Sequence, residues 1–533
     1  MRMKKRTAAR SMAALMGAAM VLTACGGGNT TAPTTGASSG GETQTASESA
    51  ESGKITKTDI VVGQASDIVT LDPAGQQDTT SGVLMKHAYS TLLDVDNEGK
   101  VVPDLAESYE MKSDTEYVFK LREDACFWDG TPVTAQDVKF SLDRAKGMPK
   151  TKSNTSKIEE VTVNGDHEVT IKLTEPYAAF KTIVTQHNLS ILSEKAVTEA
   201  GDSYGDVDNL LGSGPFKVTE WVPNDHYTLV RNDNYWGEMP IATSITCRVI
   251  PEGSARTIAL EAGEIDVVWS VDPTDCANVE SNPDVKLLSQ PSTGIDYVGM
   301  NTQKEKFSDK RVRQAINYAL DKQTFVDTII EGRGLVANSY INAAIPGWTD
   351  EVEAYPYDPE KAKELLAEAG YPDGFECSIF VNGDLRTRSA QILQAQLADV
   401  GIKVDISTYE WGALLDTLNA GEHEMFLLGW SNTSFDPDGS TYQLFYSGNH
   451  GATGNRAFFS NDKVDELILS AQRESEESKR MELYKELQVV LHDESPWCPL
   501  YYKENNVGVR ADLKGFTLHA GAQHYLGNCH YEE

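Results

Sequence analysis

A loop with one large aromatic residue and two carboxylates follows an apolar run late in the chain. The loop LGWSNTSFDPDG spans residues 428–439 and carries Trp430, Asp436 and Asp438. The apolar residues before it predict a strand that ends here. A loop of this composition suits a catalytic site, a ligand-binding site or only a polar turn. The rest of the chain must decide among these three.

Two further groups of residues could take part in binding. Arg386 and Arg388 follow a predicted strand at residues 378–381 and are expected to precede a helix. An arginine there could bind a carboxylate through two parallel hydrogen bonds, although at least one of the two is expected to be a solvated surface residue. The stretch TYEWG (408–412) forms a second strand-to-helix junction, whose residues could instead serve in helix capping and packing.

Motifs of known catalytic chemistry are absent from the sequence. His423-Glu424 has no second histidine at zincin spacing, and Gly212-Ser213-Gly214 does not form a nucleophile elbow. No glycine-rich phosphate loop is present. Active sites can assemble from distant residues, so this absence lowers the expectation of an enzyme without excluding one.

The start of the chain predicts export. A basic stretch precedes the apolar run Ser11–Ala24, so residues 1–24 read as a signal peptide whose run is too short for an ordinary membrane-spanning helix. The run ends in LTAC, which resembles a bacterial lipobox, and Cys25 is expected to be lipidated. A plain signal peptide with an incidental cysteine is the alternative. Residues 25–53 are almost free of apolar side chains and predict a flexible tether.

Charge and cysteine content exclude some partners. Acidic residues outnumber basic ones by 80 to 47, and the net charge is −33, so nucleic acid is not an expected partner. The six cysteines after Cys25 form no CxxC, and we expect mostly buried, unreactive thiols, although an exported chain could oxidise them. Cys529-His530 has no companion cluster, so neither a metal nor a cofactor is expected.

Strands alternate with helices over the whole body, which predicts an α/β fold. Asp358-Pro359 is expected to start a helix that stops at Gly370, and Thr134 to cap another. A third helix is expected to follow Arg386 and to end at Gly401.

Several blocks of the sequence resemble one protein family and occur in that family's order. The first is PDLAESYEMKSDTEYVFKLREDACFWDGTPVTAQDVKFSLDR at residues 103–144. The others are GSGPFKVTEW (212–221), VRNDNYWG (230–237), RTIALEAGEIDVV (256–268), FSDKRVRQAINYALDKQ (307–323), YDPEKAKELLAEAGY (357–371) and SPWCPLYY (495–502). Together they resemble the family 5 extracellular solute-binding proteins, the peptide- and nickel-type receptors of ATP-binding-cassette importers. Most of these residues are expected to build the scaffold and not to contact ligand.

The resemblance implies a two-lobed α/β fold of the periplasmic-binding-protein type, type II, in its large variety with an extra subdomain in lobe I. Its cleft closes over a solute by a hinge motion. We expect lobe I at residues 54–298 plus 500–533, with the extra subdomain at roughly 90–210, and lobe II at residues 299–499. The strands that cross between the lobes are expected at Tyr297–Asn301 and Pro499–Tyr502.

The resemblance also gives the opening loop a role. In peptide receptors of this family, an Asp four residues before the Pro of this loop often binds the ligand's α-ammonium. Here the Pro is Pro437, and Thr433 stands four residues before it. A threonine hydroxyl cannot neutralise an ammonium, so Asp436 or Glu410 could substitute, or the ligand could present another group there. The predicted ligand-binding residues are Trp430, Thr433, Asp436, Arg386, Tyr409, Glu410 and Trp411.

The leading hypothesis is a monomeric, lipid-anchored receptor that captures short peptides and delivers them to an importer permease. Residues 450–461 and 515–527 also resemble a subset that includes glutathione-binding receptors. The expected location is the outer face of the cytoplasmic membrane, or the periplasmic space if the cell has an outer membrane. An oligosaccharide receptor of the same fold, with Trp411 and Trp430 stacking on sugars, is the first alternative. A secreted hydrolase is the second, and it would require titratable groups that converge in the cleft.

Overall fold

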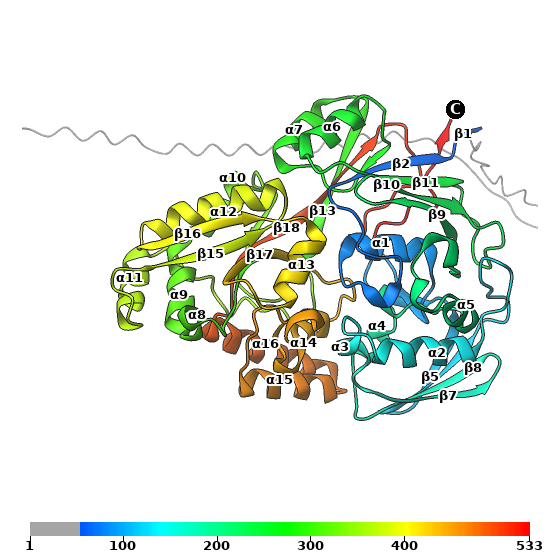
Figure 1. The fold of residues 1–533 in the computed structure, drawn as a ribbon, viewed down its shortest axis with the longest axis horizontal. Helices are drawn as coiled ribbons and strands as arrows, with labels where there is room; N and C mark the ends of the chain where they lie inside the picture. Colours follow the sequence, from blue (N-terminus) through cyan, green and yellow to red (C-terminus); the bar gives the residue numbers. More distant parts are fainter. Residues whose placement is uncertain (1–53) are drawn as a thin grey trace, which may run out of the picture. The chain divides into compact units, whose positions relative to one another are not determined.

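One eleven-stranded sheet runs through residues 54–533, the part of the chain that the computed structural model describes. Its strand order is β16-β15-β17-β13-β18-β12-β2-β11-β10-β9, with β14 paired to β18 (Figure 1). The mixed sheet with helices packed against it confirms the predicted α/β class. The predicted signal peptide (1–24), the lipidation site Cys25 and the tether (25–53) lie outside the described residues.

Two long strands cross between the halves of the molecule. Strands β13 (Val285–Met300) and β18 (Trp497–Arg510) pair from Val285↔Arg510 to Gly299↔Trp497. At one end β18 pairs with β12, and at the other end β13 pairs with β17 (Figure 1). The predicted crossings at Tyr297 and Pro499 lie within these strands, and the two residues face each other in the ladder. The ladder is irregular between Pro291 and Ile295.

The first half contributes one end of the sheet and an added subdomain. The added subdomain is an antiparallel sheet of order β5-β6-β8-β7 that packs on helix α2. Along its two central strands, β6 and β8, buried residues alternate with more exposed ones, as expected for a sheet covered on one side. The elements of this half outside the subdomain are β1 (Ile55–Lys57), β2 (Asp59–Gln64), α1 (Thr79–Ala88), β9 (Phe216–Val222), β10 (His226–Arg231), β11 (Ser244–Val249), α6 (Gly253–Glu261), β12 (Val267–Val268), α7 (Cys276–Ser281) and β19 (Tyr531–Glu532).

The subdomain segment also carries short helices, and its 3-10 helix His187–Leu189 packs against α1. Its elements are β3 (Leu93–Val95), β4 (Val101–Pro103), β5 (Ala106–Ser113), β6 (Glu116–Leu121), α2 (Ala135–Lys146), α3 (Lys152–Thr155), β7 (Ile158–Gly165), β8 (Glu168–Leu173), α4 (Phe180–Ile183) and α5 (Glu194–Ala200).

The second half carries the other end of the sheet and most of the longer helices. Its elements are α8 (Glu305–Ser308), α9 (Lys310–Ala319), α10 (Lys322–Thr328), β14 (Gly334–Val336), α11 (Pro359–Glu368), β15 (Phe375–Val381), α12 (Gly383–Ala398), β16 (Ile402–Thr408), α13 (Trp411–Asn419), β17 (Met425–Ser431), α14 (Asp438–Phe445), α15 (Asp462–Arg473) and α16 (Glu477–Glu494). We propose to keep the predicted lobe boundaries, 54–298 plus 500–533 for lobe I and 299–499 for lobe II, and we use these names below.

Capping residues in the sequence correctly predicted the starts of two helices. Asp358 caps α11, and its side chain accepts a hydrogen bond from the Lys361 amide, as predicted. Thr134 and Asp137 form a capping box at α2. One expectation was wrong: Arg386 does not precede a helix but lies inside the first turns of α12. Strand β15 ends at Val381, and Gly383, at φ +72°, makes the turn that starts the helix earlier.

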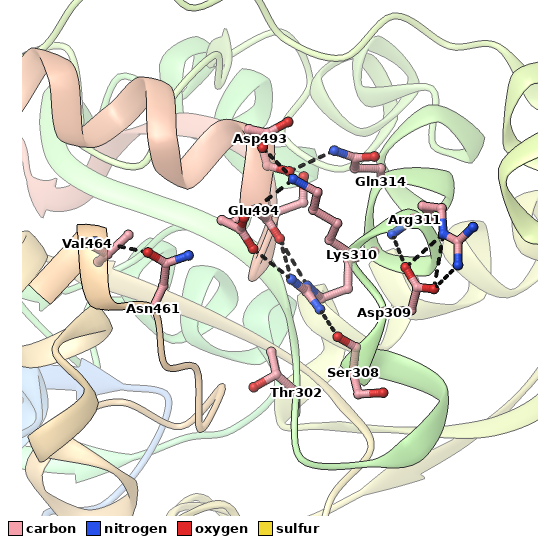
Figure 2. Close-up of polar contacts among 12 residues, drawn as sticks. Thr302, Ser308, Asp309, Lys310, Arg311, Gln314, Asn461, Val464, Asp493 and Glu494 are labelled. Carbon is pink, nitrogen blue, oxygen red and sulfur yellow. Dashed lines mark hydrogen bonds and ion pairs between the residues drawn. The ribbon is translucent and has the colours of Figure 1, made fainter.

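A signature block of the sequence builds contacts between two helices of lobe II. Figure 2 shows Lys310 and Gln314 of α9 reaching Asp493 at the end of α16. The Arg313 guanidinium, only 3% exposed, donates to the Glu494 carbonyl oxygen at 2.6 Å. None of these residues lines the cavity described below. This block therefore serves the scaffold, as expected for most of the recognisable residues.

Candidate binding site

A cavity of about 390 Å³ lies between lobe I and lobe II. Lobe I contributes the start of α1 and the segment after β12, and lobe II contributes the starts of α12 and α13 and the end of β17. Residues 503–506 of the crossing strand β18 complete the wall. A volume of this order suits a small ligand that both lobes enclose.

Side chains of the two lobes touch each other around the cavity. Arg388 Nη2 lies 2.7 Å from Asp272 Oδ2, and the Tyr177 hydroxyl donates to Asp438 at 2.5 Å. These contacts join residues of α12 and α14 to the opposite lobe. The structure is therefore a closed arrangement of the lobes, in which the cavity is held between them.

Two of the predicted ligand-binding residues in the opening loop, Trp430 and Thr433, line the cavity. Trp430 does so with its ring held in place, because its Nε1 donates to the Gly439 carbonyl oxygen at 3.0 Å. Thr433 also lines the cavity, and its hydroxyl donates to Gln186 Oε1 of lobe I at 2.9 Å. The Thr433 hydroxyl therefore makes a contact between the lobes. It does so at the position where the family resemblance would place an ammonium-binding carboxylate.

Arg386 and Trp411, both predicted for the site, lie together on the lobe II wall. The guanidinium carbon of Arg386 is 6.0 Å from the centre of the Trp411 ring, within the range of a cation–π contact. Arg386 Nη2 is 3.8 Å from Asp296, whose other oxygen lies 2.8 Å from Lys503 Nζ. Since Lys503 is the closer partner of Asp296, the Arg386 guanidinium keeps hydrogen-bonding capacity for a ligand.

Three predicted residues do not line the cavity. The Asp436 carboxylate is buried and accepts two hydrogen bonds from Arg480, at 2.9 and 2.5 Å, so its charge is already neutralised. Tyr409 packs against Phe380, and Glu410 precedes α13 without a capping hydrogen bond from its side chain. Their positions argue against direct ligand contact. The sequence placed them near the right loops, but it could not show which way each side chain points.

The sequence analysis did not identify Asp78 and Arg456 as cavity residues, nor Arg333, Lys503 and Glu504, which also line the cavity. Asp78 caps α1, with Oδ1 accepting from the Ser81 amide at 2.9 Å, while Oδ2 is enclosed and has no hydrogen-bond partner. Arg456 is only 7% exposed, and its Nε donates to Asn419 Oδ1 at 3.0 Å. Asp78 was indistinguishable from an ordinary helix cap, and Arg456 lies in an irregular segment with no motif that marks a ligand.

Burial changes the ionisation of both groups. Burial raises the pKa of the Asp78 carboxyl, and the hydrogen bonds from Ser81, the Lys150 charge and the nearby Trp411 indole oppose that rise. Burial lowers the pKa of the Arg456 guanidinium, against the attraction of Tyr297 and Asp78. Arginine nevertheless stays charged in proteins, so the cavity contains a charge that a bound anion would stabilise.

Enclosed polar atoms without partners gather in this cavity. Buried polar groups in folded proteins are almost always paired, and exceptions call for an explanation. Six such atoms belong to residues that line the cavity, namely Gln77 Oε1, Asp78 Oδ2, Trp269 Nε1, Arg386 Nε, Trp411 Nε1 and Gln523 Oε1. A polar ligand with donors and acceptors would satisfy them, and an apolar ligand would leave them unpaired.

The structure offers no obvious metal site within residues 54–533, where no three histidine, cysteine or acidic side chains lie close enough to hold an ion. The six cysteines of this range are all free, and all but Cys126 are buried. Among the described helices, none combines the length and the apolar character needed to cross a bilayer.

Comparison with known proteins gives consistent matches. A family model described as bacterial extracellular solute-binding proteins, family 5 Middle, matches residues 100–452. The glutathione-binding protein GsiB of Shigella boydii serotype 4 (strain Sb227) is 32% identical over 479 residues, which cover 86% of this chain and 92% of that protein. The dipeptide-binding protein of Escherichia coli (strain K12) is 30% identical over 470 residues, covering 81% and 86%.

A solved structure agrees with the fold described above. The periplasmic binding protein DppA of Helicobacter pylori, associated with an ABC transporter and in complex with the peptide STSA, superposes with a TM-score of 0.85 at 28% identity. The match covers 90% of this chain and 99% of that chain. This likeness confirms the predicted two-lobed α/β fold.

Proposed function

Because this chain belongs to the bacterial extracellular solute-binding proteins of family 5, we propose that it captures a short, charged peptide in the cavity between its lobes. Members of the family are transport proteins that work with the permease of an ATP-binding-cassette importer outside the cytoplasm. The proposed cycle needs no chemistry: the lobes close on the peptide, and the permease receives it unchanged.

The observation that carries the proposal is the set of unpaired polar and charged atoms enclosed in the cavity. A peptide backbone supplies donors and acceptors along its length, and its termini supply two opposite charges. Arg386 would bind a carboxylate of the ligand, because its guanidinium is only loosely paired with Asp296. Trp411 and Trp430 would form walls against which the apolar parts of the peptide pack.

A neutral oligosaccharide fits this cavity less well. The indole rings could stack on sugar rings, but hydroxyl groups would not neutralise the buried Arg456 charge or the Asp78 carboxylate. Leaving a charge buried without a partner is costly. The cavity charges therefore favour a zwitterionic ligand.

The proposal includes attachment to the membrane. A lipid on Cys25 would hold the protein at the outer face of the cytoplasmic membrane, or within the periplasmic space if the cell has an outer membrane. The segment 25–53 would let residues 54–533 reach the permease as a monomer. Mass spectrometry of the mature protein should find a lipid-modified amino terminus at Cys25.

Isothermal titration of the purified protein with peptide and glutathione pools tests the function. We expect micromolar binding, about 8 kcal/mol, which a few charge-assisted hydrogen bonds in an enclosed site can supply. Arg386→Met should weaken binding by about 10- to 100-fold. Lys403→Met is the matched control in lobe II, because Lys403 is 77% exposed. Absence of heat with every peptide, or binding of sugars alone, would contradict the proposal.

A further inference from the structure

A tyrosine of the added subdomain reaches into lobe II at a point away from the cavity. The Tyr177 ring packs within the hydrophobic core of the subdomain, whereas its hydroxyl donates to Asp438 Oδ2 of α14 at 2.5 Å. Gln472 of α15 donates to the other oxygen of the same carboxylate at 2.9 Å. All three residues are only 1% exposed, and none of them lines the cavity. A ligand in the cavity therefore does not touch this contact between Tyr177 and Asp438, which we call the latch.

Further hydrogen bonds join the subdomain to lobe II around the latch. The Ala178 amide donates to the Gln472 carbonyl oxygen at 2.8 Å. Gln443 of α14 donates to Asn154 Oδ1 of α3 at 2.5 Å, and Figure 1 shows these two helices next to each other. Gln443 also lines the cavity. Helix α14 therefore connects the latch to the cavity wall, so that the two form together when the lobes close.

Closing the lobes has two opposing effects on the Asp438 carboxylate. Burial raises the pKa of its carboxyl to about 6, and the nearby Asp436 charge adds to that rise. The Tyr177 hydroxyl, the Arg480 charge and the Gln472 amide oppose the rise. Among these groups only Tyr177 belongs to lobe I, so separating the lobes removes its hydrogen bond and admits water to the carboxylate. Closing thus costs the hydration of a charged group and gains one hydrogen bond to it.

Resting on the proposed capture of a ligand between the lobes, we propose that the latch sets the balance between open and closed lobes and thereby the affinity for ligand. Because its two contributions oppose each other, the latch does not hold the lobes closed by itself, and a ligand in the cavity supplies the remaining free energy. Tyr177 is then a positioning residue, since it acts on the ligand only through the position of the lobes.

The two residues of the latch have opposite expected effects on closure. Tyr177→Phe keeps the ring in the subdomain core and removes the hydroxyl, so the closed form loses a hydrogen bond to a charged group. Asp438→Asn removes the charge that closure must dehydrate and keeps an oxygen that can accept from Tyr177. Its new amide can donate to Gln472 Oε1, which has no hydrogen-bond partner among the described residues. A contact that served only the scaffold would be weakened by both substitutions.

Small-angle scattering of the full-length protein tests the latch without any ligand. Tyr177→Phe should have a larger radius of gyration than Asp438→Asn, because the first favours open lobes and the second closed lobes. Tyr89→Phe is the matched control and should match the unaltered protein, since the buried Tyr89 hydroxyl donates to the Leu71 carbonyl oxygen within lobe I, at 3.2 Å. Circular dichroism checks the fold of each variant, and Tyr177→Phe against Tyr89→Phe decides the question if Asp438→Asn does not fold. Superimposable curves for the compared variants would overturn the latch.

The rate of ligand release measures the same balance with glutathione as the probe. In stopped-flow tryptophan fluorescence, Tyr177→Phe should release glutathione about tenfold faster than the unaltered protein, and Asp438→Asn should release it more slowly. Association rates should change by less than about threefold, because the latch forms after the ligand has entered. Faster release from both variants would overturn the latch and assign both residues to the scaffold. Absence of binding by every protein, with glutathione and with the peptide pools, would overturn the proposed function, and the scattering comparison would still decide the latch.

Discussion

Two groups of buried charge, one within the Trp430 loop and one in the cavity, differ in how their charges are satisfied. In the scaffold group, Asp436 is paired with Arg480 through two hydrogen bonds, and Asp438 accepts from Tyr177 and Gln472. In the cavity group, neither Asp78 nor Arg456 has an oppositely charged side chain within 4.0 Å among residues 54–533.

The difference separates stability from binding. A charge that the protein itself completes stabilises the fold once it is buried, and removing its partner is destabilising. A charge left incomplete costs stability and is retained where a ligand completes it. Both groups contain buried Asp and Arg residues, so residue type alone does not distinguish them. What distinguishes them is whether another side chain of the protein pairs with the charge.

The largest effect is expected from breaking the paired group. Arg480→Met should lower the free energy of unfolding by about 3–5 kcal/mol, because it leaves the Asp436 carboxylate buried without a partner. Denaturant unfolding followed by circular dichroism measures the change. Lys479→Met, on the same helix and 66% exposed, is the control and should change stability by less than about 0.5 kcal/mol. Equal midpoints for the two variants would show that the pair does not stabilise the fold.

Asp104 provides an incompletely paired carboxyl away from the cavity. It accepts from the Thr91 amide at 2.7 Å, and burial, followed by the nearby Asp94 charge, raises the pKa of its carboxyl to about 7. Between about pH 4 and pH 7 the unfolded chain therefore loses this proton while the folded protein keeps it. Stability should fall with rising pH over that window, and the loss should be complete above it.

Asp104→Asn should remove this fall and gain about 1–2 kcal/mol at pH 8, with no gain near pH 4. Thermal unfolding at a series of pH values measures both. Asp124→Asn, at a side chain that is 63% exposed, is the control. A gain of the same size at pH 4 and pH 8 would show that the effect does not come from ionisation.

Asp78, in the cavity, is a second carboxyl whose pKa is raised by burial. Because burial raises the pKa of its carboxyl, the ionised form destabilises the ligand-free protein at neutral pH. Asp78→Asn should therefore raise the melting temperature of the ligand-free protein at pH 7.5 by a few degrees, and not at pH 4. A lowered melting temperature at pH 7.5 would assign Asp78 to the scaffold and would remove it from the cavity group.

The sequence predicted the fold far better than the site. Strand and helix patterns and the cap at Asp358 follow from local spacing, which the chain carries within a few residues. The crossing strands at Tyr297 and Pro499 came from the family resemblance. The sequence also identified Trp430, Thr433, Arg386 and Trp411, which line the cavity.

The remaining site residues depend on long-range geometry. Asp436 differs from a ligand-binding carboxylate only because Arg480, on another helix, reaches it. Asp78 differs from an ordinary cap only because one of its oxygens is enclosed without a partner. Neither property is encoded by neighbouring residues, so no local pattern could have separated them.

The smallest effect is expected where the two lobes meet outside both groups. Arg388 of α12 and Asp272 of lobe I form an ion pair at 2.7 Å, with side chains that are 34% and 14% exposed. Solvent weakens a pair of this kind, so Arg388→Met should weaken glutathione binding by only about two- to fivefold, through loss of a contact made when the lobes close. Asp272→Asn keeps the cap at Thr274 and should have a similar effect. The double variant should be no weaker than either single one, because both remove the same contact. Additive losses in this cycle would show that the two residues act separately and that their pairing does not favour the closed form.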